Sequence, residues 1–185
     1  VGGSLFLFAL RAPKVGLGGA FGLVSRESLL LMNNVLLVVA AGSVLLGTLY
    51  PLFIDALGMG KLSVGPPYFN AVFVPLMVPA LLLMAPGPLM RWKHGNAADV
   101  AKQLWPAALA ALTFAVAVPF AYGRWSPLVA LGLALAAWIV GASAVGIVAR
   151  LRGSQGGLFS QRRSWWGMHL AHVGVAAFVL GVTLV

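Results

Sequence analysis

The sequence predicts an all-α fold, a polytopic transmembrane helix bundle with about five spans plus a truncated N-terminal half-span. Composition is the first reason. Hydrophobic residues make up 61% of the 185 residues and charged residues only 8%, whereas a soluble domain needs roughly a quarter of its residues charged. The second reason is patterning, because the apolar residues gather in stretches of about the 20 residues that cross a bilayer as a helix.

Each predicted span is a long apolar stretch bounded by polar or turn-forming residues. The first ten residues, VGGSLFLFAL, form the half-span. The five complete spans are expected at residues 28–54, 70–90, 104–122, 127–149 and 165–185. We expect residues 1–185 to form a single membrane domain. Because both ends stop inside apolar stretches, we expect this domain to be a fragment of a larger polytopic protein.

Proline and small residues predict local features of two spans. Pro75, Pro79, Pro86 and Pro88 crowd the stretch 70–90, and proline removes a backbone donor and clashes with the preceding turn. We therefore expect a kink there, or a break near the basic end of the span.

Two small-xxx-small pairs lie in the stretch 127–149, Ala137 with Gly141 and Ala142 with Gly146. Such pairs allow a neighbouring helix to approach closely. The alternative is that they reflect only the abundance of small residues in membrane helices.

The basic residues follow a pattern that predicts the topology. Ten of the twelve Lys and Arg lie on the connectors 11–27, 91–103 and 150–164, and the other two are Lys61 and Arg124. The positive-inside rule places the three basic connectors of this multi-pass chain in the cytoplasm. The formal charge of +9 is thus a topology signal that involves membrane lipid, and no nucleic acid partner is expected.

Several kinds of chemistry are excluded or unsupported. The acidic residues are Glu27, Asp55 and Asp99, all on connectors, so no pair of carboxylates can share a site within a span. The chain has no cysteine, which excludes a disulfide framework and a thiolate metal site. The serines have no His or Asp companion at a spacing typical of nucleophilic catalysis.

Two histidines, His169 and His172, interrupt the last apolar stretch. His172 lies seven residues past Trp165, roughly 10 Å along a helix, and His169 lies one turn nearer the interface. An ionisable residue inside the membrane is a functional candidate, for example as a haem ligand, because neutral imidazole is a common axial ligand of haem iron. A structural histidine hydrogen-bonded to another helix is an equally good interpretation from physics alone. We expect His169 to reach water or lipid head groups.

Three stretches together carry a family resemblance: VSRESLLLMNNVLLVVAAGSVLLGTLYPL (24–52), GKLSVGPPYFN (60–70) and GMHLAHVGVAAFVLG (167–181). In this order they resemble the large haem-lyase subunit of bacterial cytochrome c maturation, the CcmF family. The resemblance runs along nearly the whole chain and matches the later membrane spans of a much larger protein. A related nitrite-reductase-specific haem lyase shares these stretches.

The resemblance implies a location in the bacterial inner membrane, a function and a cofactor. Members of the family take haem from a periplasmic haem chaperone and help to attach it to apocytochrome c, together with other cytochrome c maturation subunits. They also hold a b-type haem in the membrane, and its axial ligand corresponds to His172 in LAHVGVA. The second axial ligand is expected upstream of residue 1, outside this chain. His169 matches no ligand position, and the family's tryptophan-rich haem-handling loop is absent, so this chain alone is not expected to be active.

The resemblance also adds possible functions to residues that have plainer structural interpretations. Arg26 could contact a haem propionate or a quinol head group, while Ser25 and Glu27 around it are typical of a helix start. Tyr68 and Phe69 could help to shape a periplasmic haem or partner surface, or could simply anchor a rigid turn at the interface. The alternative for the whole chain is a non-catalytic membrane scaffold or a transporter fragment in which both histidines are structural.

Overall fold

The computed structural model describes residues 2–14, 22–121, 123, 125–152 and 161–185. Within these ranges it contains helices and no strand, which confirms the predicted all-α class. The elements are α1 (Gly2–Arg11), η1 (Ala12–Lys14), α2 (Arg26–Ala56), α3 (Pro66–Met84), η2 (Gly87–Leu89), α4 (Ala97–Ala121), α5 (Pro127–Arg152) and α6 (Arg163–Leu184). Among the described residues, the five helices α2 to α6 are long and apolar enough to cross a membrane, and α1 is a shorter apolar helix.

Two helices, α3 and α4, begin four or more residues earlier than predicted. Helix α3 begins at Pro66 rather than at residue 70, because proline at the first helical positions already has the φ angle of a helix. Helix α4 begins at Ala97 rather than at residue 104. Its first turns are polar, and the Oδ1 of Asn96 accepts a hydrogen bond from the N–H of Ala98 at 3.0 Å. Apolar length therefore predicted the lipid-facing part of α4 and missed the polar turns before it.

The predicted proline break lies at the end of α3. The helix continues through Pro75 and Pro79 and ends at Met84, and the short 3-10 helix η2 follows. Pro86 has no N–H to donate to the carbonyl of Leu82, four residues earlier. The indole Nε1–H of Trp138 on α5 donates to that oxygen instead, at 3.1 Å. A donor from another helix thus satisfies the carbonyl that proline leaves free.

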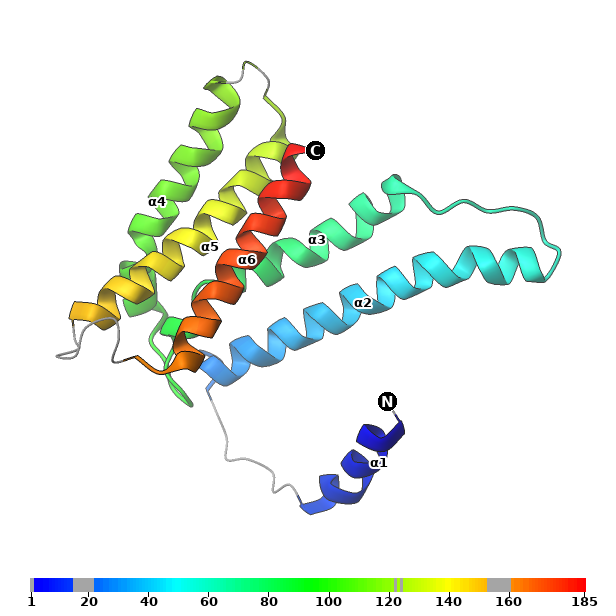
Figure 1. Cartoon of the computed structure of the whole chain (residues 1–185), viewed down its shortest axis with the longest axis horizontal. Helices are drawn as coiled ribbons and strands as arrows, with labels where there is room; N and C mark the ends of the chain where they lie inside the picture. The colour runs from blue at the N-terminus through cyan, green and yellow to red at the C-terminus, as the bar shows by residue number, and fades with distance from the viewer. Residues whose placement is uncertain (1, 15–21, 122, 124, 153–160) are drawn as a thin grey trace.

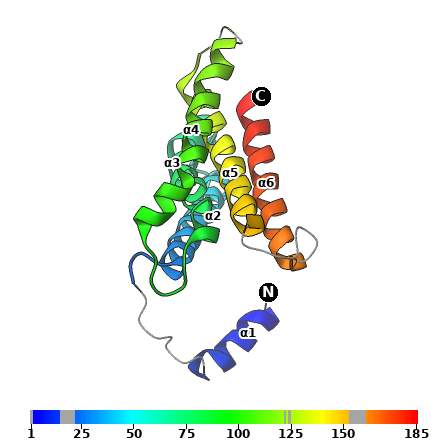
Figure 2. The same cartoon turned by 90° about the vertical axis from the view of Figure 1, so that its left-hand side faces the viewer.

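Helices α4, α5 and α6 stand side by side, with α5 packed between the other two (Figures 1 and 2). Ile139 and Leu133 of α5 are fully buried. A Cβ added at Gly141 would lie 3.0 Å from the Cβ of Ala107 on α4, and one at Gly146 would lie 3.3 Å from Cε1 of His169 on α6. Both glycines of the predicted small-residue pairs are therefore sites of close helix approach.

Helices α2 and α3 form a long hairpin that leans away from the other three spans (Figure 1). We call α4, α5 and α6 the three-helix unit. Helix α3 contacts α5, and α2 contacts η2. The hairpin therefore meets the three-helix unit near the start of α2 and the end of α3 (Figure 1). At the other end of the hairpin, the ring of Tyr68 lies against Gly47, and its hydroxyl donates to the carbonyl of Ser43 at 3.0 Å. Most of the large apolar side chains of α2 are exposed.

The described connector residues that border α2, α4, α5 and α6 on the basic side lie at one end of the molecule (Figure 1). The N–H of Arg26 donates to the carbonyl of Arg91 at 3.0 Å, which joins the connector that ends at residue 27 to the one that begins at residue 91. Nε of Arg150 donates to Oε1 of Gln161 at 3.0 Å, which joins the end of α5 to the segment before α6. The helices alternate in direction, so the connectors around Lys61 and residue 123 lie at the opposite ends of their helices (Figure 1). The cytoplasmic assignment of the basic end stays a prediction.

Single cysteines can test that assignment, because the chain has no cysteine of its own. Ser63 and Ala98 are both exposed and lie at opposite ends of the bundle. We expect a membrane-impermeant maleimide added from the periplasm to label Ser63→Cys and not Ala98→Cys. Permeabilised cells provide the control, in which both variants should react. Labelling of Ala98→Cys alone in intact spheroplasts would reverse the topology.

Candidate functional site

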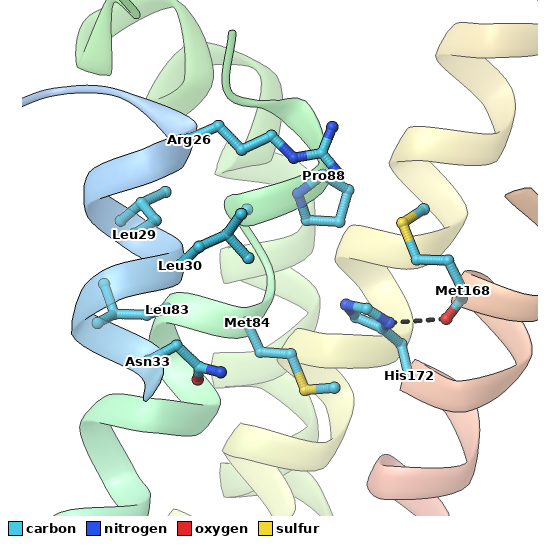
Figure 3. A pocket seen from close by; sticks show the side chains of 10 residues that line it. Arg26, Leu29, Leu30, Asn33, Leu83, Met84, Pro88, Met168 and His172 are labelled. Atoms are coloured by element: carbon cyan, nitrogen blue, oxygen red, sulfur yellow. Dashed lines mark hydrogen bonds between the residues drawn. The ribbon is translucent and has the colours of Figure 1, made fainter. Parts of the chain in front are cut away.

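The main cavity lies where the hairpin meets α6, between α2, α3, η2 and α6 (Figure 3). Its volume is about 240 Å³. Apolar side chains form most of its wall, among them Leu29, Met84 and Pro88. The polar side chains that line it are Arg26, Asn33 and His172. Such a mostly apolar cavity with a few convergent polar groups is typical of a cofactor site.

The ring of His172 is held by its own helix and faces this cavity. Its Nδ1 lies 2.7 Å from the carbonyl oxygen of Met168, one turn earlier on α6. A carbonyl oxygen can only accept, so Nδ1 carries the proton and donates it to that oxygen. Nε2 is then the ring nitrogen with a free lone pair, and it points into the cavity (Figure 3). Donation from one ring nitrogen to a backbone carbonyl is the usual way to prepare the other as a metal ligand.

Arg26 lines the same cavity from the other side. It is the first residue of α2, and its guanidinium lies over the ring of Trp92, 4.9 Å from the centroid. In Figure 3 the guanidinium extends over Pro88 at the basic end of the cavity. The sequence hypotheses gave Arg26 a haem propionate or a quinol head group as its contact and gave His172 the haem iron. The structure places the two residues at one cavity. Asn33 also lines this cavity, whereas Asn34 is exposed outside it.

A pair of backbone segments holds Arg26 in place. We call residues 22–27 and 91–95 the connector clamp. The N–H of Gly22 donates to the carbonyl of Lys93 at 2.8 Å, and the N–H of Gly95 donates to that of Val24 at 2.7 Å. Oε2 of Glu27 accepts from the N–H of Lys93 at 2.8 Å. The connector clamp therefore joins the start of α2 to the segment that leads from η2 to α4.

The start of α2 is itself capped as predicted. Ser25 is fully buried, and its Oγ accepts a hydrogen bond from the N–H of Ser28 at 3.2 Å. The hydroxyl of Ser28 in turn donates to the carbonyl of Gly22 at 2.9 Å. Glu27 lies in the first helical turn, where a negative charge is favourable. The capping interpretation of this segment is confirmed, and it leaves the guanidinium of Arg26 available for the cavity.

The expectation for His169 was wrong. Its side chain does not reach water or lipid head groups but is only 5% exposed. The ring lies between Trp165, at 4.5 Å between centroids, and Gly146 of α5. Its Nε2 is buried without a hydrogen-bond partner, which costs about 1–3 kcal/mol if nothing satisfies it. Helix rotation, rather than depth, decides its surroundings, since His169 turns toward α5 while His172 faces the cavity.

Tyr68 and Phe69 lie in the first turns of α3, not on a free connector. Their rings meet edge to face at 5.3 Å between centroids. The hydroxyl of Tyr68 is directed at α2, and both side chains are half-buried. The contacts of Tyr68 therefore stabilise the hairpin, and a periplasmic partner surface at these residues stays a prediction.

Comparison of the sequence and the structure with known proteins identifies several relatives of this chain. A protein of Pseudomonas fluorescens, "Cytochrome c-type biogenesis protein CcmF", is 49% identical over 186 aligned residues, which cover 100% of this chain. A solved structure, "Cytochrome c Heme Lyase CcmF", superposes with a TM-score of 0.68 at 28% identity over 88% of this chain. The chain is related to the CcmF proteins over its whole length. The resemblance found in the sequence is therefore confirmed. No family model matches the sequence.

The CcmF relatives are much longer than this chain. The alignment covers 28% of the Pseudomonas fluorescens protein, and the superposition covers 25% of the solved CcmF chain. The related "Cytochrome c-type biogenesis protein NrfE" of Haemophilus influenzae is 42% identical but matches only 42% of this chain. The CcmF relationship thus accounts for more of the sequence than the NrfE relationship does.

The cavity fits part of a haem. It offers an imidazole nitrogen with a free lone pair, apolar walls and a guanidinium at its basic end. Its volume is below the roughly 300–1,000 Å³ that is typical of complete ligand sites. The cavity therefore has room for only one side of such a site, and its polar groups are the imidazole of His172, the guanidinium of Arg26 and the amide of Asn33.

Sequence reasoning missed several residues of this site. Met84 and Met168 line the cavity, and Trp92 covers Arg26. Methionine is common in any apolar stretch, so nothing in the sequence marked Met84 or Met168. Trp92 was recognisable only as an aromatic residue at a span end. Trp92 follows the Pro86–Pro88 break closely in the sequence, and this closeness was the one signal that could have linked Trp92 to a site.

Replacing Tyr68 by Phe tests its structural contact. The change removes the hydroxyl that donates to Ser43 and keeps the ring against Gly47. We expect a loss of about 0.5–1.5 kcal/mol in the free energy of unfolding, measured in detergent. Tyr50→Phe, on an exposed position of α2, is the matched control and should be neutral. Unchanged stability in Tyr68→Phe together with lost cytochrome c assembly would favour a partner surface instead.

Proposed function

We propose that this chain forms one wall of a membrane haem b site in a CcmF-type cytochrome c haem lyase, and that His172 is an axial ligand of that haem. The observation that carries the proposal is the free Nε2 of His172 in an apolar cavity. The relatives of this chain, which are named as cytochrome c biogenesis proteins and a cytochrome c haem lyase, support the same proposal. When bound, the haem supplies an iron centre that exchanges one electron.

The chain's own residues have distinct parts in this site. The Met168 carbonyl keeps the proton of His172 on Nδ1, so that Nε2 stays available as a ligand. The apolar side chains of Leu29, Met84 and Pro88 exclude water from the same space. The guanidinium of Arg26 is a planar fork that matches a carboxylate, and in this site the carboxylate is a haem propionate. A quinol head group is the alternative partner of Arg26. The second axial ligand comes from outside this chain.

The wider function follows from the relatives. We propose that the complete protein acts in the bacterial inner membrane, takes haem from a periplasmic haem chaperone and helps to attach it to apocytochrome c with other maturation subunits. Tyr68 and Phe69 would contribute to the periplasmic face of that assembly. This chain alone would be inactive, because it supplies only one side of the site.

His172→Ala in the full-length protein tests the ligand. We expect the low-spin visible spectrum of the membrane haem to be lost or greatly weakened, and cytochrome c assembly to be abolished, because nothing else on α6 faces the cavity with an imidazole. External imidazole should partly restore the spectrum by filling the vacated space.

His169→Ala is the comparison for His172→Ala. The ring of His169 lies between Trp165 and Gly146 and does not line the main cavity. The visible spectrum of the haem should therefore be largely retained. A normal low-spin spectrum in His172→Ala, with its loss in His169→Ala, would move the ligand by one turn. Absence of haem from the purified wild-type protein would favour the alternative, a scaffold or transporter fragment with structural histidines.

Arg26→Gln tests the propionate contact. Removing a positive charge beside the haem favours the ferric state, so the midpoint potential should fall. A unit charge roughly 10 Å from the iron, at an effective dielectric constant of about 20, contributes on the order of 1–2 kcal/mol. With 59 mV for a tenfold change in a one-electron couple, that is a shift of several tens of millivolts.

Arg91→Gln is the matched control for Arg26→Gln. It removes the same charge from the connector clamp, but Arg91 is exposed and does not line the cavity. The midpoint potential of the haem in Arg91→Gln should stay close to that of the wild type. Equal shifts in the two variants would indicate a general effect of surface charge, and no shift in Arg26→Gln would leave Arg26 only its place in the helix start.

A further inference from the structure

The buried side of α6 contains a second, much smaller cavity, of about 10 Å³. It lies between α5, α6 and η2, and Ser143, Gly146, His169 and His172 are among the residues that line it. A volume of about 10–15 Å³ available to the centre of a water-sized probe is the lower limit for one buried water molecule. The cavity is therefore at the lower limit for one water molecule and is too small for a larger ligand.

The ring of His169 has an unmet need at this cavity. The side chain is 5% exposed, and its Nε2 has no hydrogen-bond partner. Nε2 lies on the ring edge that faces Gly146, because a Cβ added at that glycine would lie 3.3 Å from Cε1 and 3.9 Å from Nε2. Buried polar atoms in folded proteins nearly always have a partner, from the protein or from ordered water.

Water is the partner that fits the space. A buried water needs two or more polar groups, and the side chains with polar atoms at this cavity are those of Ser143, His169 and His172. Nδ1 of His172 already donates to the carbonyl of Met168. The Ser143 hydroxyl can both donate and accept, and its residue is 6% exposed.

We propose that this cavity is a binding site for one structural water molecule, hydrogen-bonded to Nε2 of His169 and to the hydroxyl of Ser143. The water satisfies the imidazole that packing has isolated and links α5 to α6 beside His172. Gly146 keeps the site open, since it leaves room in front of the ring edge. This site is separate from the iron-facing side of His172, so it does not depend on the proposed haem function.

Solid-state NMR of the full-length protein in lipid, with ¹⁵N-labelled histidine rings, tests the proposal without requiring haem. The Nε2 resonance of His169, assigned by its absence in His169→Phe, should show a cross-peak to slowly exchanging water protons. In Gly146→Ala the resonance should remain and the water cross-peak should fall to background, because the new methyl group occupies the space before Nε2.

Two further variants keep the test decisive. Ser143→Ala removes the second partner without adding volume and should also abolish the cross-peak, so it decides the question if Gly146→Ala does not fold. Gly174→Ala adds the same methyl group to α6 where nothing lies within 4 Å, and should leave the cross-peak unchanged. A wild-type Nε2 without a water cross-peak, or a cross-peak that persists in either Gly146→Ala or Ser143→Ala, would overturn the proposal.

Discussion

The hydrogen bond from Trp138 to the carbonyl of Leu82 is the interaction on which the arrangement of the spans depends. Pro86 cannot donate to that carbonyl, and water is absent from the core of a bilayer, so the oxygen needs a donor from another helix. The bond joins the α2–α3 hairpin to the three-helix unit at the point where α3 ends. The break that follows produces η2, and residues of η2 line both cavities. The proline that leaves the Leu82 carbonyl without its helical donor thus also ends α3, and the segment that follows forms part of the wall of both cavities.

The two histidines show how a rotation of less than one helix turn places two side chains in different surroundings. His169 and His172 are three residues apart, and an α-helix turns by roughly 100° per residue, so their side chains are related by about 300° rather than a full turn. That offset is enough to direct His169 at Gly146 of α5 and His172 at the cavity beside α2. Both rings are partly or wholly removed from water, but only His172 has one nitrogen satisfied by its own helix and the other free in an open space.

The connector clamp gives the positive charges a structural context. Basic residues near the membrane surface are usually read as topology signals, and most of these fit that description. Arg26 differs because the backbone bonds of residues 22–27 with 91–95, and the ring of Trp92, hold it at the mouth of the cavity. Its charge is thereby brought to a defined position, which a flexible surface arginine would not occupy.

Apolar length and composition by themselves determined the class of fold, the number of spans and most of their limits, because a helix in lipid must be long and apolar whatever it packs against. The prolines located the break after Met84. The histidine pattern marked His169 and His172 as candidates, and the family resemblance chose His172 between them. Only the tertiary structure decided that Arg26, Asn33 and His172 share a cavity, that His169 is buried, and that Tyr68 binds α2. Hydropathy does not distinguish a lipid-facing side chain from one that faces a neighbouring helix, since both environments are apolar. Helix rotation and the contacts between distant connectors therefore had to come from the packed structure.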